Sequence, residues 1–197
     1  MYEKYTTIGF VINSRNFSEA DKLLSVFTED FGLIKVLVKS VRNIKSKYKA
    51  YIEVGFKIKI TVIKGRGIWR ATDIECDFFE QLSLKSLKYF IKPILFIKNL
   101  VHGEDKNEVL FGSIDESFCF LRENILSDED LGLFEIVFSI RIMNALGYIG
   151  SIDSRLNLSG KLTESDIDFS RSNKRSLIGI INSSLKETHL IQNKTMS

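Results

Sequence analysis

The chain has 197 residues, of which 44% are hydrophobic and 27% charged, and these ordinary values exclude disordered and fibrous classes. Two cysteines, Cys76 and Cys119, form no CxxC pair, which excludes a cysteine zinc framework and is typical of a reducing compartment. The net charge of +3 conceals a division, because residues 1–72 have 14 Lys and Arg against 6 Asp and Glu, a net of +8. The remaining residues therefore have a net of −5.

The start of the chain has no basic region followed by an apolar run, so we expect no secretion signal and a cytoplasmic location. The most apolar stretches, residues 90–101 and 131–149, are interrupted by Lys and Glu or Arg. They predict core helices rather than membrane spans.

Alternation of apolar and polar residues predicts five β-strands in the first part of the chain, at residues 6–13, 22–28, 33–39, 54–63 and 68–77. In the first strand, Ile8, Phe10 and Ile12 predict one buried face. A loop or short helix is expected at residues 40–52, and Gly65 and Gly67 predict a tight turn that exposes the residue between them.

Five strands with an irregular insert between the third and fourth are the layout of an OB-fold barrel. Beyond residue 79 the apolar period changes from 2 to 3.6 and predicts helices, with Pro93 kinking or splitting the first of them. Ser127 should cap a helix that stops at Gly147, and residues 151–173 read as irregular before a last helix at 174–187. The expected fold class is α+β: an OB-fold domain at 1–79 and an α-helical domain at 80–197.

No pattern predicts an enzyme. His102 and His189 are far apart in sequence and belong to no metal-ligand or nucleophile–base motif, and neither phosphate-binding glycine loop occurs. The acidic run after Ser127 could hold a hard cation, but it is explained more simply by helix capping. We therefore expect no cofactor, no metal site and no catalytic residue.

Residues 33–72 contain eleven Lys and Arg but a single acid, Glu53, which favours an anionic partner over a merely solvated face. By strand alternation or position in a connection, we predict that nucleic acid is bound by Lys35, Lys39, Arg42, Lys45, Lys47, Lys49, Lys57, Lys59, Arg66 and Arg70. The first eight of these cations, from Lys35 to Lys59, should form one surface. The candidates for stacking on bases, with barrel packing as the alternative for each, are Phe17, Tyr48, Tyr51 and Trp69.

Several motifs follow one another along the first part of the chain: a Glu-x-Asp-x-Leu strand start, a Phe-Thr-x-x-x-Gly hairpin, a basic connection, a long amphipathic strand and a Gly-Arg-Gly turn. A later helix ends in Gly-Tyr. The residues of the two spaced motifs and of this helix end are Glu19, Asp21, Leu23, Phe27, Thr28, Gly32, Phe134, Glu135, Gly147 and Tyr148. In this order the motifs resemble the N-terminal domain of the RecO family of bacterial recombination mediators, and the helix end is also similar to that family.

The resemblance implies a protein that binds single- and double-stranded DNA, anneals strands, works with RecR and single-strand-binding protein, and assists RecA loading. The sequence departs from the family at Ser40, where Gly is usual, and at Glu53–Val54, where a Pro is usual. Residues 151–170 also lack the four cysteines of the zinc module that many members have. Two alternatives stay open: a general single-stranded DNA or RNA binder, and a helical interaction scaffold with a vestigial barrel.

Overall fold

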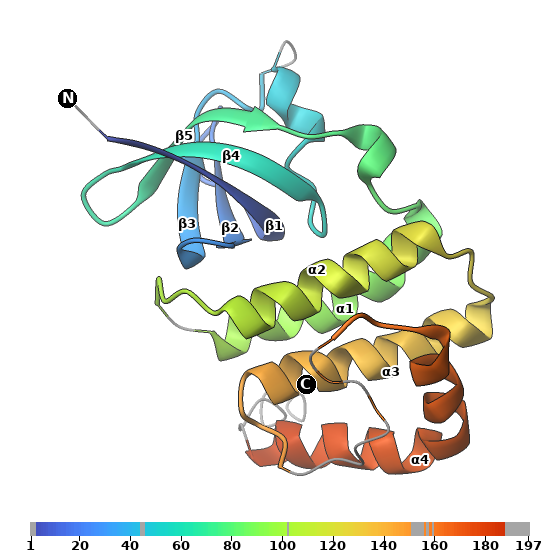
Figure 1. Ribbon diagram of the computed structural model, residues 1–197. Coiled ribbons are helices and arrows are strands. Elements are labelled where there is room, and N and C mark those ends of the chain that lie inside the picture. The colour runs from blue at the N-terminus through green and yellow to red at the C-terminus, as the bar shows by residue number, and fades with distance from the viewer. Residues whose placement is uncertain are drawn as a thin grey trace, which may run out of the picture. The chain divides into compact units, whose positions relative to one another are not determined.

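The computed structural model describes residues 3–43, 46–101, 103–150, 156, 158 and 160–187. In that part of the chain, five strands precede four α-helices (Figure 1). The strands are β1 Lys4–Asn16, β2 Lys22–Thr28, β3 Gly32–Val38, β4 Lys57–Lys64 and β5 Trp69–Glu75. The α-helices are α1 Leu84–Leu100, α2 Glu108–Glu123, α3 Asp128–Ala145 and α4 Glu164–Glu187, and the short 3₁₀ helices are η1 Lys47–Ala50 and η2 Phe78–Glu80.

The chain divides into two compact units. The first combines Met1–Leu82 with Leu100–Phe111, and the second combines Ser83–Asn99 with Gly112–Ser197. The connection between α1 and α2 therefore groups with the barrel, although it follows the first helix in sequence.

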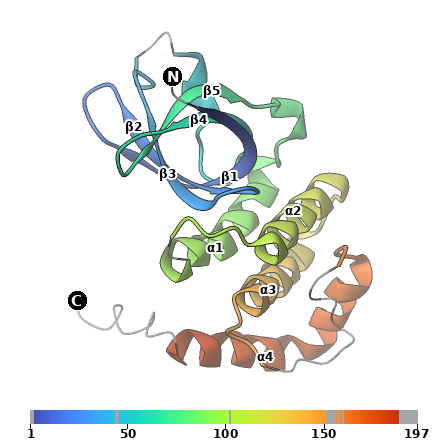
Figure 2. The ribbon, with the colours of Figure 1, turned by 60° about the vertical axis from the view of Figure 1, so that its left-hand side comes forward.

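The five strands close into a barrel in the order β1-β2-β3-β5-β4, which Figure 2 shows as a ring. All neighbours are antiparallel except β3 and β5, which pair in parallel. This closed five-stranded barrel is the predicted OB-fold, and the seam between β3 and β5 that closes it has two register pairs, Val36 with Trp69 and Leu37 with Arg70.

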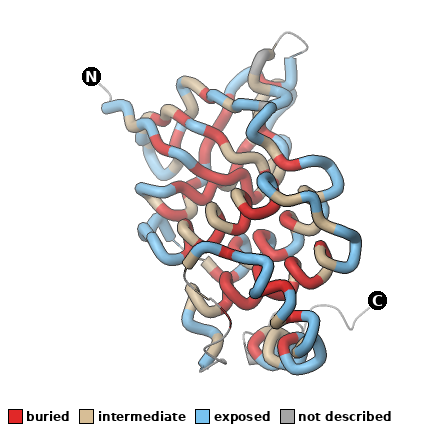
Figure 3. The backbone as a smooth tube through the Cα atoms, turned by 45° about the vertical axis from the view of Figure 1, so that its right-hand side comes forward, coloured by how far each residue is buried: buried red, intermediate tan, exposed pale blue. Residues whose placement is uncertain are grey.

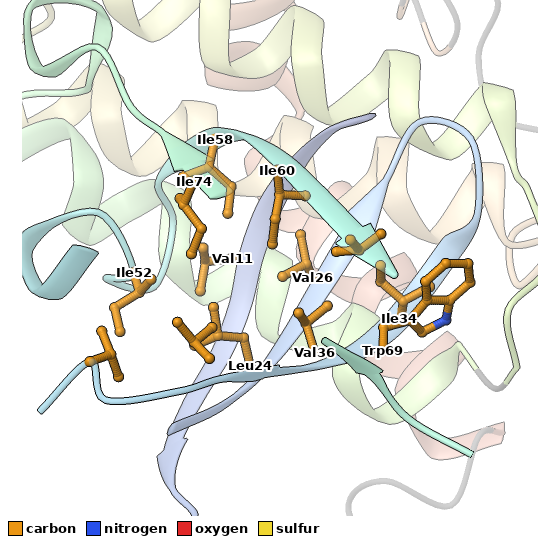
Figure 4. Packing of buried hydrophobic residues seen from close by; sticks show 13 residues of the cluster. Val11, Leu24, Val26, Ile34, Val36, Ile52, Ile58, Ile60, Trp69 and Ile74 are labelled. Carbon is orange, nitrogen blue, oxygen red and sulfur yellow. The ribbon is translucent and has the colours of Figure 1, made fainter. Parts of the chain in front are cut away.

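Branched aliphatic side chains from all five strands fill the barrel, including Ile34, Val36 and Ile60, all fully buried. In Figure 4 this cluster extends from Ile52, in the basic connection between β3 and β4, at one end to Trp69 at the other. The alternation predicted for β3 and β4 is confirmed, because alternate aliphatic residues such as Val36 and Ile60 belong to the core and Lys35 and Lys59 are exposed.

The face predicted for β1 is confirmed only in part: Phe10 and Ile12 are fully buried as expected, but Ile8 is not, and the opposite face is buried as well. Val11 belongs to the barrel core and Ile8 is 37% exposed, while a register shift between Val11 and Asn13 interrupts the alternation. Phe10 is buried for another reason: its ring lies 5.9 Å from that of Phe111, which covers the outside of the barrel.

The helical unit is built around α3, which is buried along most of its length and packs against α4. Figure 3 shows buried residues along the strands and helices and exposed residues at the turns. Ser127 is the N-cap of α3, since its side chain accepts from the backbone N–H of Asp130, as predicted. α1 continues through Pro93 as one helix.

The second half of α4 matches the prediction, but its first half does not. The helix begins at Glu164, where a polar, irregular segment was expected, and its backbone departs from helical angles at Asn173. Buried Asp166 accepts a hydrogen bond from the backbone N–H of Thr163 and so caps the start of the helix. The spacing of apolar residues gives no indication of this polar cap. Within the described ranges, no helix is both long and apolar enough to cross a membrane.

Candidate nucleic-acid interface

Three cations lie on the outer face of the β3–β5 pair. Lys35 in β3 and Lys39, the residue after β3, lie two positions on either side of Leu37, and Leu37 is the register partner of Arg70 in β5. Because the neighbours of Leu37 in sequence point into the barrel, the three cationic side chains share the outside, and all three are exposed. None of the three has an ion pair among the residues that the structure describes.

The basic connection leaves this face at the end of β3 and is tied to the β1–β2 turn. Ser40 has a positive φ of 55°, its N–H donates to Asp21 (2.8 Å), and Arg42 donates from Nη1 to the carbonyl of Ser18 (2.7 Å). A left-handed backbone explains why glycine suits the position of Ser40. Arg42 therefore holds the turn as well as adding charge.

The other predicted cations of the connection are only partly described. Lys49 is exposed in η1. Lys45 and the side chain of Lys47 lie outside the described residues. Arg66 is exposed at the tip of the β4–β5 hairpin, where the N–H of Gly65 donates to the carbonyl of Ile68 (3.0 Å).

Lys57 and Lys59 lie elsewhere on the barrel. Lys59 is the register partner of Glu75, whereas Arg70 pairs with Ile63, four residues further along β4, or about 13 Å at the usual rise of a strand. The expected single surface is thus divided into two groups. We call the first the β3–β5 face, comprising Lys35, Lys39 and Arg70, and the second the β4 groove.

The β4 groove has a volume of about 560 Å³ and contains both signs of charge. Its lining includes the two lysines and three acids, namely Lys57, Lys59, Glu75, Asp77 and Glu80. Lys59 forms an ion pair with Glu75 (3.3 Å), and Lys57 is half-buried over the ring of Phe10. The acids neutralise the lysines here, so this region offers little field to a polyanion.

Cys76 also lines the β4 groove and is not a nucleophile at neutral pH. Burial, with a smaller effect from the charge of Asp77, raises the pKa of its thiol to about 11. The protonated thiol is the less reactive form. Among the described residues, no group of three or more His, Cys, Asp or Glu is arranged to hold a metal ion.

The four aromatic candidates are placed very differently. Phe17 is 56% exposed in the β1–β2 turn, whereas Trp69 is 3% exposed and belongs to the barrel core. Tyr48 and Tyr51 are half-buried against the same core, and the hydroxyl of Tyr48 donates to Asp73 (2.8 Å). Only Phe17 of these four presents most of its ring to solvent.

Two residues near the β3–β5 face were not among the predicted site residues. Arg15 is exposed at the end of β1, beside Phe17, and Lys22 begins β2 opposite Val38 at the end of β3. The register of the β2–β3 hairpin pairs Lys22 with Val38, the residue before Lys39, and this pairing places Lys22 close to the basic connection.

The comparisons with known proteins agree with this architecture. Residues 1–77 match the family model described as Recombination protein O N terminal. DNA repair protein RecO of Rubrobacter xylanophilus is 30% identical over 165 residues, which are 79% of this chain and 62% of that protein. DNA repair protein RecO of Clostridium novyi is 24% identical over 150 residues, or 73% of this chain and 56% of that protein.

The chain thus spans less than two-thirds of the length of either relative. The family match covers the barrel, and the similarity to the relatives extends well beyond it into the helices. The chain belongs to the RecO family, and its barrel is the N-terminal OB-fold domain of that family.

Proposed function

We propose that this protein acts in DNA repair and recombination by binding single-stranded DNA on the β3–β5 face. The observation that carries the proposal is the exposure of Lys35, Lys39 and Arg70 on β3, just after it and on the neighbouring β5, without an ion pair in the described parts of the chain. An OB-fold binds oligonucleotides on the face of its second and third strands and through the loops that follow its first and fourth strands, and the β3–β5 face shares β3 with that surface. The names of the relatives support DNA as the ligand.

Binding on this face would be mainly electrostatic. Lysine and arginine attract phosphates whatever the base, and exposed Phe17 can stack on any base because every base has a π-face. A protein that holds single strands without reading their sequence is suited to annealing complementary strands. We therefore include annealing and assistance to RecA loading in gap repair, a binding role rather than catalysis, in the proposal.

The proposed partners are RecR and single-strand-binding protein, with the bacterial cytoplasm as the place of action. One candidate acceptor for an acidic, amphipathic peptide is the outer side of α1. There Lys88 and Lys98 are exposed and Leu95 is 40% exposed. Lys92 forms an ion pair with Glu135 (2.8 Å). Calorimetry with the C-terminal peptide of the host's single-strand-binding protein tests this part, and no heat at high peptide concentration would end it.

A titration of fluorescent oligonucleotides over a series of salt concentrations tests the main proposal. Each phosphate contact on a single strand contributes about −0.7 to the slope of log K against log salt. We expect a clearly negative slope and a preference for DNA over RNA in competition. A preference for RNA would favour a general single-strand binder, and the absence of polyanion binding would favour a protein-interaction scaffold.

A further inference from the structure

The connection between α1 and α2 contains an acidic residue, Glu104, that contacts a cation and an aromatic residue at one end of the barrel. Glu104 accepts a hydrogen bond from Nε1 of Trp69 (2.9 Å) and forms an ion pair with Nζ of Lys64 (3.4 Å). The same Nζ lies 5.1 Å from the centroid of the indole ring. An oxyanion is thus bound by an ammonium group and an indole N–H together.

These donors belong to the β4–β5 hairpin, because Lys64 and Trp69 are its last register pair before the turn. The turn itself exposes Arg66, and Trp69 is paired on its other side with Val36 of β3. The pair therefore borders the β3–β5 face through the strand that contains Arg70. The hairpin loop after β4 is also one of the two loops that oligonucleotides contact in OB-folds.

The indole is fixed in position by its neighbours. The ring of Trp69 lies 5.1 Å from that of Phe31 and 5.8 Å from that of Tyr5, and its side chain is 3% exposed. Lys64 and Glu104, by contrast, have 65% and 42% of their side chains exposed. An incoming anion can therefore replace the carboxylate by side-chain rotation, without moving the barrel core.

The backbone of the connection is held close to the barrel. Gly32 has a positive φ of 64°, and a Cβ atom there would lie 2.1 Å from the carbonyl oxygen of Asp105, so only glycine fits beside this segment. Phe111, at the other end, packs on Phe10 and Phe27. Glu104 is thereby kept at a high local concentration next to its two donors.

We propose that Lys64 and the indole N–H of Trp69 form a subsite for a backbone phosphate, and that Glu104 competes with the phosphate for them. The inference rests on the proposed DNA binding and adds a regulatory contact to it. A phosphate oxygen has the same chemistry as the carboxylate, namely a charged acceptor for one ammonium and one N–H donor. Glu104 therefore weakens DNA binding at this end of the barrel until a phosphate displaces it.

Glu104→Gln tests the competition, with Glu108→Gln as the matched control. Glu108 is the first residue of α2, directly after the connection, and loses the same charge, but its partner is Lys106 (2.8 Å). For an oligonucleotide longer than the ~16 nucleotides that one OB-fold covers, we expect Glu104→Gln to lower Kd about three- to ten-fold at low salt. Glu108→Gln should change Kd by less than about two-fold, because screening limits long-range effects.

Two further readouts separate the contact from a general change in charge. The gain from Glu104→Gln should disappear when Lys64→Gln is also present. Trp69 is the only tryptophan of the chain, so its emission should shift both on adding oligonucleotide to the parent and on introducing Glu104→Gln alone. The inference would be overturned if Glu104→Gln and Glu108→Gln lowered Kd equally, or if the lower Kd of Glu104→Gln persisted in the presence of Lys64→Gln. Either result would leave the proposed DNA binding intact. If the parent binds no DNA, the proposed function fails and the subsite with it.

Discussion

Two groups of lysines on the same barrel differ in their surroundings rather than in their number. On the β3–β5 face, Lys35 and Lys39 are exposed, and neither forms an ion pair with any residue that the structure describes. In the β4 groove, Lys59 is paired with Glu75, and Asp77 and Glu80 line the same cavity. The comparison shows that the charge of a sequence segment is not the charge of a surface.

The difference arises because folding brings in acids from outside the basic segment. Residues 33–72 contain one acid, but the end of β5 and η2 place three more beside Lys57 and Lys59. Glu104 comes from still further along the chain to neutralise Lys64. A polyanion should therefore bind where no acidic side chain neutralises the lysines, as on the β3–β5 face.

The largest expected effect follows from reversing charge on the β3–β5 face. Lys35→Glu with Lys39→Glu should weaken single-stranded DNA binding roughly ten- to hundred-fold at low salt, because two phosphate contacts become repulsive. Thermal stability should change little, since substitutions at exposed positions usually stay within about 0.5 kcal/mol. Oligonucleotide titration measures the first and a thermal melt the second.

The control for that variant is Lys88→Glu with Lys98→Glu, which makes the same charge change at two exposed positions of α1. It should bind DNA about as well as the parent. If the control pair were the more damaging one, the helical unit rather than the barrel would hold the DNA site.

An effect of comparable size is expected from the aromatic residue next to the basic face. Phe17→Ala should cost about 1–3 kcal/mol of binding free energy for each stacked base that is lost. Tyr48→Phe, which removes the hydrogen bond to Asp73 but keeps the half-buried ring, should leave binding unchanged and cost about 1 kcal/mol of stability. Equal losses of DNA binding in the two variants would show that Phe17 acts through structure rather than stacking.

The smallest effect should come from removing the acids of the β4 groove. Glu75→Gln, Asp77→Asn and Glu80→Gln together free Lys57 and Lys59 and should tighten DNA binding by about three- to five-fold at low salt. At physiological salt the gain should fade, because a Debye length of about 8 Å screens exposed charges. If DNA binding did not tighten at any salt concentration, the location of Lys57 and Lys59 on the barrel, and not their neutralisation by acids, would explain why they do not bind DNA.

Much of the barrel could be predicted because period-2 alternation reports which side of a strand is buried. The inward aliphatic residues and outward lysines of β3 and β4 follow it, whereas β1 does not, since a register shift and the cover of Phe111 intervene. The first half of α4 was missed because its polar start depends on capping by Asp166 rather than on an apolar face.

The candidate site was harder to predict than the fold. Alternation correctly indicated that Lys35 and Lys59 are exposed, but it contains no information on which acids approach them from later segments. For Trp69, sequence left base stacking and core packing equally open. Its contact with Glu104, 35 residues away, and its place in the core depend on tertiary structure.

The most direct test of the account compares salt dependence for two neutralised pairs, Lys35→Gln with Lys39→Gln and Lys57→Gln with Lys59→Gln, on one oligonucleotide. The first pair should make the log–log salt slope less negative by about 1.4, two contacts at about 0.7 each. The second should leave the slope of the parent unchanged. Equal changes in slope for both pairs, or a change confined to the β4 groove pair, would contradict the claim that DNA binds on the β3–β5 face.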